Sequence, residues 1–97
     1  MAAYVMANLE VTDPAGFAPY REAVPATIAK YGGRYLARGG TAVAVEGGST
    51  PKRVVVLEFP DLATAHAWLN SPEYQPLIAI RQRTAKTDLW LIEGIAT

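Results

Sequence analysis

The chain of 97 residues has room for one domain, and its nine basic and nine acidic side chains cancel to a net charge of zero. The basic residues stand singly or in pairs along the sequence, so we expect no nucleic-acid partner. The absence of cysteine excludes disulfides and thiolate chemistry. Since no apolar run approaches the roughly 20 residues of a membrane span, we expect a cytoplasmic protein without a membrane partner, with residues 1–97 as a single domain.

The first expected element is a strand from Tyr4 to Val11, in which apolar residues alternate with a second, mixed face. That second face carries Asn8 near its middle. A buried amide needs hydrogen-bond partners. We therefore interpret Asn8 either as bonded to a neighbouring bulge or to its own backbone, or as a contact to a ligand.

A helix is predicted next, because Asp13 suits an N-cap and Pro14 suits a first helical position. Apolar residues then recur at spacings of three and four, at Phe17, Tyr20, Val24, Ile28 and Tyr31. The glycine pair Gly32 and Gly33 ends this helix, since glycine readily adopts the left-handed conformation of a C-terminal cap.

The segment from Arg34 to Glu46 is expected to form one bent strand, with a bulge or sharp bend at Gly39 and Gly40 where a positive φ is possible. The composition of Gly47–Lys52 is typical of a turn. We therefore predict a hairpin loop of about six residues, joining this bent strand to the next strand.

The strand expected from Arg53 to Phe59 is apolar from Val54 onward apart from Glu58, which indicates a strand that is covered on both faces. A helix is predicted after the N-cap Asp61. The segment Asn70–Pro72 breaks the chain before a short third helix, and Thr87–Glu93 supplies the last strand, which is again apolar on both faces.

This order of elements predicts an α+β fold of ferredoxin-like βαββαβ topology, with an extra short helix before the last strand. Helices can cover only one face of such a sheet. An apolar face of domain size exceeds what monomers usually expose, so we expect a homodimer in which two sheets pair face to face as a dimeric α+β barrel.

Several segments also resemble a known family, the domain of unknown function 1330. The resemblance is carried by ANLEVTD, VPATIAKYGGRYLARGG, VVLEFPD, LNSPEYQPL and RQRTAKTDLWLIEG. It implies the dimeric α+β barrel superfamily. That superfamily includes cofactor-free quinol monooxygenases, chlorite dismutase-like haem proteins, muconolactone isomerase-like enzymes and stress-response proteins, and analogy of fold selects none of them.

Aromatic side chains supply the first candidate binding residues. Trp68, Tyr74 and Tyr35 offer flat apolar surface with indole and phenol donors, which suits a pocket for a planar ligand. The alternative is that they only pack the core. Trp68 and Tyr74 flank the break at Asn70–Pro72, where the helices diverge, so we predict a cleft there that Asn8 also borders.

Two arginines complete the candidate ligand-binding set. Arg81 shares the inner face of the third helix with Tyr74, and Arg38 precedes the glycine pair, so either guanidinium can anchor a carboxylate or phenolate. Both can instead form salt bridges with Glu58 or Glu93. We also expect Glu58 to meet an arginine at the subunit interface.

No catalytic centre can be identified from the sequence. His66 is the only histidine and has no polar partner at helical spacing, so we expect it at the surface and predict no metal site. No cofactor is expected.

Three hypotheses follow: a small dimeric protein that binds an apolar or aromatic molecule between sheet and helices, a cofactor-free monooxygenase-like or isomerase-like enzyme acting on an aromatic or quinol-type substrate, and a stress-associated or purely structural dimer.

Overall fold

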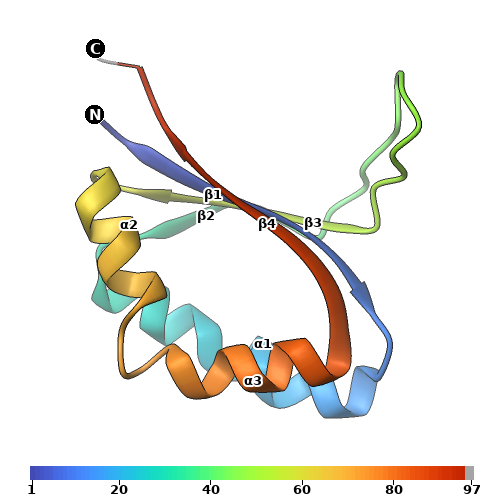
Figure 1. The fold of residues 1–97 in the computed structure, drawn as a ribbon, viewed down its shortest axis with the longest axis horizontal. Coiled ribbons are helices and arrows are strands. Elements are labelled where there is room, and N and C mark those ends of the chain that lie inside the picture. The colour runs from blue at the N-terminus through green and yellow to red at the C-terminus, as the bar shows by residue number, and fades with distance from the viewer. Residues whose placement is uncertain (96–97) are drawn as a thin grey trace.

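A computed structural model describes residues 1–95 and places seven elements in them, in the predicted order. The elements are β1 (Ala3–Val11), α1 (Pro14–Lys30), β2 (Arg34–Arg38), β3 (Arg53–Phe59), α2 (Leu62–Leu69), α3 (Gln75–Thr84) and β4 (Ala85–Glu93). The strands form one antiparallel sheet in the order β2-β3-β1-β4, and the helices lie together on one side of it (Figure 1). The predicted α+β ferredoxin-like fold is confirmed.

The central strand β1 sets the two faces of the sheet. Its residue Val5 pairs with Leu57 of β3 and with Leu91 of β4, and these three side chains point toward the helices. Buried and partly buried residues alternate from Ala3 to Leu9, which follows from the two-residue period of a strand. The core therefore lies between this inner face and the three helices.

The two predicted N-caps form. The Asp13 carboxylate accepts a hydrogen bond from the Gly16 amide at 3.1 Å, and the Asp61 carboxylate accepts one from the Thr64 amide at 2.7 Å. The hydrogen bonds from Thr64 lower the pKa of Asp61. Each cap satisfies an amide that the first turn of a helix leaves free.

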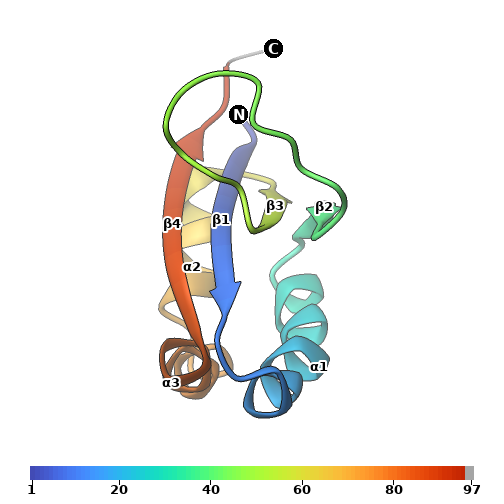
Figure 2. The same ribbon diagram turned by 90° about the vertical axis from the view of Figure 1, so that its right-hand side faces the viewer.

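The second strand is shorter than predicted. β2 ends at Arg38, and the rest of the expected strand belongs to an irregular arm, residues 39–52, that projects from the sheet on the side away from the helices (Figures 1 and 2). The bulge lies between Tyr35 and Ala37 rather than at the glycines. Of the predicted pair, only Gly39 adopts a positive φ, at 74°. The longer strand was predicted because Val43 and Val45 are typical strand residues. They form no strand here, since an apolar pair without a partner strand gains no stability from an extended conformation.

Within residues 1–95, no helix covers the outer face of the sheet (Figure 1). Trp90 and Ile92 of β4 lie on it beside Met6 and Tyr4 of β1, and they remain 51% and 46% exposed. The expectation that helices cover one face only is therefore confirmed. Within residues 1–95, no helix has the length and apolar character needed to cross a bilayer.

Candidate functional site

A cleft opens between the inner face of the sheet and the helices, and residues from all seven elements or their ends border it. Its apolar lining consists of Val5, Ala7, Leu9, Phe17, Val24, Ile28, Val55, Leu57 and Leu89. The cavity measures about 50 Å³, whereas one that holds a benzene ring measures roughly 150 Å³. An aromatic ligand therefore enters only if side chains at the mouth move outward.

One wall of the cleft is a stack of aromatic rings. Trp68 of α2 stacks on Tyr74, with the ring centroids 4.1 Å apart and the planes inclined by 27°, and the centroid of the Phe59 ring lies 5.3 Å from that of the indole. The indole Nε1 donates to the buried hydroxyl of Thr27 at 3.0 Å, which in turn donates to the Val24 carbonyl at 2.8 Å. These bonds fix the indole, so Trp68 and Tyr74 both belong to the core and border the cleft.

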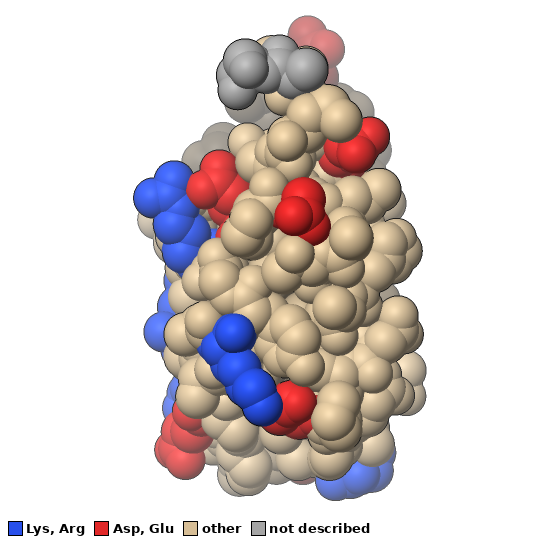
Figure 3. All heavy atoms as spheres, turned by 90° about the vertical axis from the view of Figure 1, so that its left-hand side faces the viewer, with Lys and Arg blue, Asp and Glu red and all other residues tan. Residues whose placement is uncertain are grey.

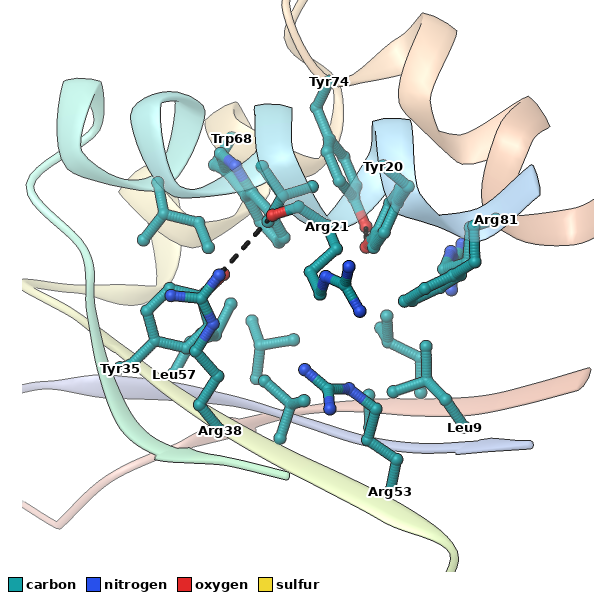
Figure 4. Close-up of a pocket in the computed structure, with 17 residues that line it drawn as sticks. Leu9, Tyr20, Arg21, Tyr35, Arg38, Arg53, Leu57, Trp68, Tyr74 and Arg81 are labelled. Atoms are coloured by element: carbon teal, nitrogen blue, oxygen red, sulfur yellow. Dashed lines mark hydrogen bonds between the residues drawn. The ribbon is translucent and has the colours of Figure 1, made fainter. Parts of the chain in front are cut away.

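A pair of phenols meets at the cleft, a feature that the sequence did not reveal. The hydroxyls of Tyr20 and Tyr74 lie 2.9 Å apart, so one donates to the other (Figure 4). Burial raises the pKa of Tyr20 and of Tyr74 above the ordinary value of a phenol, although the nearby Arg81 guanidinium acts in the opposite direction. Both phenols are therefore neutral at pH 7, and the accepting hydroxyl keeps its own proton to donate.

A third phenol lies near the mouth. Tyr35 of β2 borders the cleft, and burial raises its pKa while Arg38 and Arg53 lower it. The guanidinium carbon of Arg38 lies 4.6 Å from the centre of the Tyr35 ring. This cation–π contact holds the guanidinium over the Tyr35 ring at the border of the cleft.

Four arginines surround the opening: Arg21 from α1, Arg38 from β2, Arg53 from β3 and Arg81 from α3 (Figure 4). The guanidinium of Arg38 donates to the Arg21 backbone carbonyl at 3.5 Å. Elsewhere the charges are dispersed, and Figure 3 shows a largely uncharged face that carries scattered charges of both signs, some of them side by side. The sequence suggested dispersed basic residues throughout, and the fold instead gathers four of the nine.

The salt bridges considered for Arg38 and Arg81 do not form in the described residues. Glu58 is bound within its own chain by Arg34, whose Nε lies 2.8 Å from a carboxylate oxygen, so the expected interface partner is not required. The Nε atom of Arg81 is buried without a hydrogen-bond partner inside residues 1–95. A buried donor in that condition is costly, so Arg81 has a hydrogen bond to offer.

The predicted placement of Asn8 at the cleft is wrong. Its side chain lies on the outer face, where Oδ1 accepts from the Lys52 amide at 2.8 Å and Nδ2 donates to the Thr50 carbonyl at 3.4 Å. Because side chains alternate along a strand, the residue between the inward Ala7 and Leu9 must point outward. Asn8 thus anchors the base of the arm through backbone groups of Thr50 and Lys52, and not through a bulge or its own backbone as expected.

Five of the six predicted ligand-binding residues come together at the cleft: Tyr35, Arg38, Trp68, Tyr74 and Arg81. The sequence missed Tyr20, Arg21 and Arg53. Tyr20 was assigned only to the apolar stripe of its helix. Arg53 lies at an inward position of β3, opposite Leu9, and the alternation of side chains along the strand was a signal for this placement. His66 is exposed, and residues 1–95 contain no cluster of three or more potential metal-ligating side chains.

Comparison with known proteins decides the family. Residues 2–95 match the family described as a domain of unknown function, DUF1330. The chain belongs to this family. The resemblance noted from the sequence segments is thereby confirmed, and no curated protein matches this DUF1330 chain.

Solved structures share the fold of this DUF1330 protein at low sequence identity. A protein of unknown function from Rhodopseudomonas palustris, RPA0582, has a TM-score of 0.78 at 14% identity, with 99% of this chain and 84% of that chain covered. SnoaB of Streptomyces nogalater, described as a cofactor-independent oxygenase, has a TM-score of 0.69 at 15% identity, covering 99% and 95%. A dimeric ferredoxin-like protein of unknown function from Jannaschia sp. CCS1 has a TM-score of 0.68 at 13% identity, covering 99% and 100%.

Proposed function

We propose that this protein binds a small aromatic molecule in the cleft between its sheet and its helices. The observation that carries the proposal is the wall formed by the stacked Trp68 and Tyr74, which faces an apolar floor beneath an open mouth. Apolar clefts with a few convergent polar groups are typical of small-molecule sites. Here the polar groups are the phenol pair and the arginines.

Nuclear magnetic resonance tests this proposal. The ¹⁵N-labelled protein is titrated with 2-naphthamide and 2-naphthoate, which have the same ring system, and the two indole signals are distinguished with a Trp90→Phe variant. Binding in the cleft shifts the Trp68 indole resonance and leaves that of Trp90, on the outer face, unchanged. If neither compound moves the Trp68 signal, the cleft is only a gap in the core, and a structural dimer is the better description.

A second candidate function is cofactor-free oxygenation of an aromatic or quinol-type substrate. Its support is the shared fold with SnoaB, together with Arg81 and the neutral phenol pair, which can stabilise negative charge developing on a bound oxygen atom. A panel of quinols with an oxygen electrode tests it. Oxygen uptake that requires the protein and falls in an Arg81→Gln variant supports the enzyme, whereas uptake equal to the buffer rate contradicts it.

The proposal includes a homodimer formed through the uncovered outer faces of two sheets. Trp90 and Ile92 supply exposed apolar surface there, and the arm adds Val43 and Val45, which are 74% and 89% exposed. The related fold from Jannaschia sp. is described as dimeric. A second copy removes this surface from water, at roughly 25 cal/mol for each Å² buried.

Sedimentation velocity checks the dimer. The wild-type protein is expected to sediment as a dimer at micromolar concentration, and Trp90→Lys is expected to dissociate it, because a charge is then placed in the apolar contact. A His66→Lys variant, with its change on the exposed surface of α2, is the matched control. A monomeric wild type, or a Trp90→Lys variant that remains dimeric, contradicts this interface.

A further inference from the structure

The cleft concentrates positive charge in a protein whose net charge is zero. Four of the nine basic residues border this one opening, and no aspartate or glutamate is among the residues that line it. The two salt bridges in the described residues involve Lys30 and Arg34, which lie elsewhere. Within residues 1–95, none of the four guanidiniums forms a salt bridge with a carboxylate.

This arrangement costs free energy unless an anion is present. Like charges that converge on one space repel one another, and the repulsion strengthens where apolar walls lower the local dielectric. The buried Nε–H of Arg81 is a further unpaired donor at the same site. An anionic group among the arginines relieves both costs, since it offsets the repulsion and accepts the free hydrogen bond.

The shape of the site narrows the class of anion. The guanidinium is planar and presents parallel N–H donors that match the two oxygens of a carboxylate. Immediately below the arginines, the floor is apolar and the wall is aromatic. A multiply charged, strongly hydrated group is disfavoured next to this apolar floor, because it would lose water molecules and gain no hydrogen bonds in exchange.

Resting on the proposed small-molecule function, we infer that the ligand is an aromatic carboxylic acid. Its ring lies against the wall of Trp68 and Tyr74, and its carboxylate points to the mouth, where it meets Arg81 and Arg38 (Figure 4). The phenol pair supplies one more donor, the proton that the accepting hydroxyl of Tyr20 or Tyr74 keeps. Entry of the ring displaces the exposed side chain of Arg21 outward.

Titration calorimetry with 2-naphthoate and its neutral isostere 2-naphthamide tests the inference. A charge-assisted hydrogen bond contributes about 1.5–3 kcal/mol, so we expect the acid to bind about tenfold or more tightly than the amide. The preference is expected to shrink as sodium chloride is raised from about 50 to 500 mM, because salt screens the guanidinium charges.

Arginine variants locate the effect. Arg81→Gln is expected to reduce the ratio of the two affinities toward one, with a similar but smaller loss in Arg38→Gln, whose exposed side chain makes a folded variant secure. Arg83→Gln is the matched control, since Arg83 lies on the same helix but does not border the cleft. It is expected to retain the wild-type ratio.

The outcomes separate the two proposals. Equal binding of acid and amide refutes the carboxylate preference and leaves the binding function intact. A preference that survives in both Arg81→Gln and Arg38→Gln also refutes it, because the anion is then recognised elsewhere. If neither compound binds, the binding function fails and this inference fails with it.

Discussion

Gly39 directly follows β2 and lies against the guanidinium of Arg53, one of the arginines that border the cleft. Replacing Gly39 by alanine tests its backbone conformation and this contact. Its φ of 74° lies in the left-handed region, and its amide donates to the Val54 carbonyl at 2.9 Å. An added Cβ would approach the Arg53 guanidinium to 2.5 Å at Nη1 and 2.9 Å at Cζ. The substitution therefore strains the backbone and pushes the arginine aside.

The magnitude follows from those two contributions. The left-handed conformation costs a residue with a side chain roughly 1–2 kcal/mol relative to glycine. The clash adds less, because the guanidinium is the flexible end of a long side chain and can rotate away. We therefore expect Gly39→Ala to lower the free energy of unfolding by about 1–2 kcal/mol, which corresponds to a fall of roughly 4–8 °C in Tm for each kcal/mol in a chain of this size.

Gly40→Ala is the matched control for this measurement. Gly40 has no positive φ, and an added Cβ would meet no heavy atom within 4 Å. Its stability is expected to change by less than about 0.5 kcal/mol, or to rise slightly because the unfolded chain loses freedom. Urea denaturation at a fixed protein concentration measures both variants. Equal midpoints for Gly39→Ala and Gly40→Ala would refute the assigned backbone conformation.

Three further predictions concern the phenols, the indole and the arm. Because the folded-state pKa of Tyr20 and Tyr74 is raised above the ordinary value of about 10, the folded state holds protons that the unfolded state loses, and stability is expected to fall as the pH rises above 10. Urea midpoints at pH 8, 10 and 11 check this, and a Tyr20→Phe variant with an undiminished fall would contradict it. Thr27→Val removes the acceptor of the buried Trp68 Nε1–H and is expected to cost about 1–3 kcal/mol; no change in the denaturation midpoint would mean that the indole finds another partner. Asn8→Ala frees the base of the arm, so faster proteolysis at residues 41–50 is expected in mass spectrometry, and cleavage at the wild-type rate would show that other contacts hold the arm.

The elements of the fold were predictable because their signals are local. Asp13 and Asp61 occupy positions at which a short acidic side chain caps a helix. In β1, apolar side chains occupy every second position, which is typical of a strand with one face in the core. The arm was not predictable in the same way. Its valines are typical of a strand, but a strand also needs a neighbour to pair with. The central strand β1 is already paired on both edges, with β3 and β4. A cytoplasmic location stays a prediction.

The wall of the cleft was predictable in part, because Trp68 and Tyr74 flank a break between helices and must lie near each other. The phenol pair was not, since Tyr20 and Tyr74 are separated by most of α1, β2, the arm, β3 and α2. Any apolar residue at position 20 would satisfy the helical stripe equally well. Only the packing of α1 beside α3 shows that the hydroxyl there has a partner.

The arginines explain why composition misleads about this protein. A net charge of zero and the dispersed basic residues are properties of the linear sequence. In that sequence Arg21, Arg38, Arg53 and Arg81 lie far apart, in four different elements. The sheet register places Arg53 and Arg38 on the inner face, and two helices bring the other pair to the same opening. No acidic side chain lies in the lining of that cleft. The positive charge of the four arginines, which acidic residues balance over the whole sequence, is therefore unbalanced at the apolar cleft between the sheet and the helices.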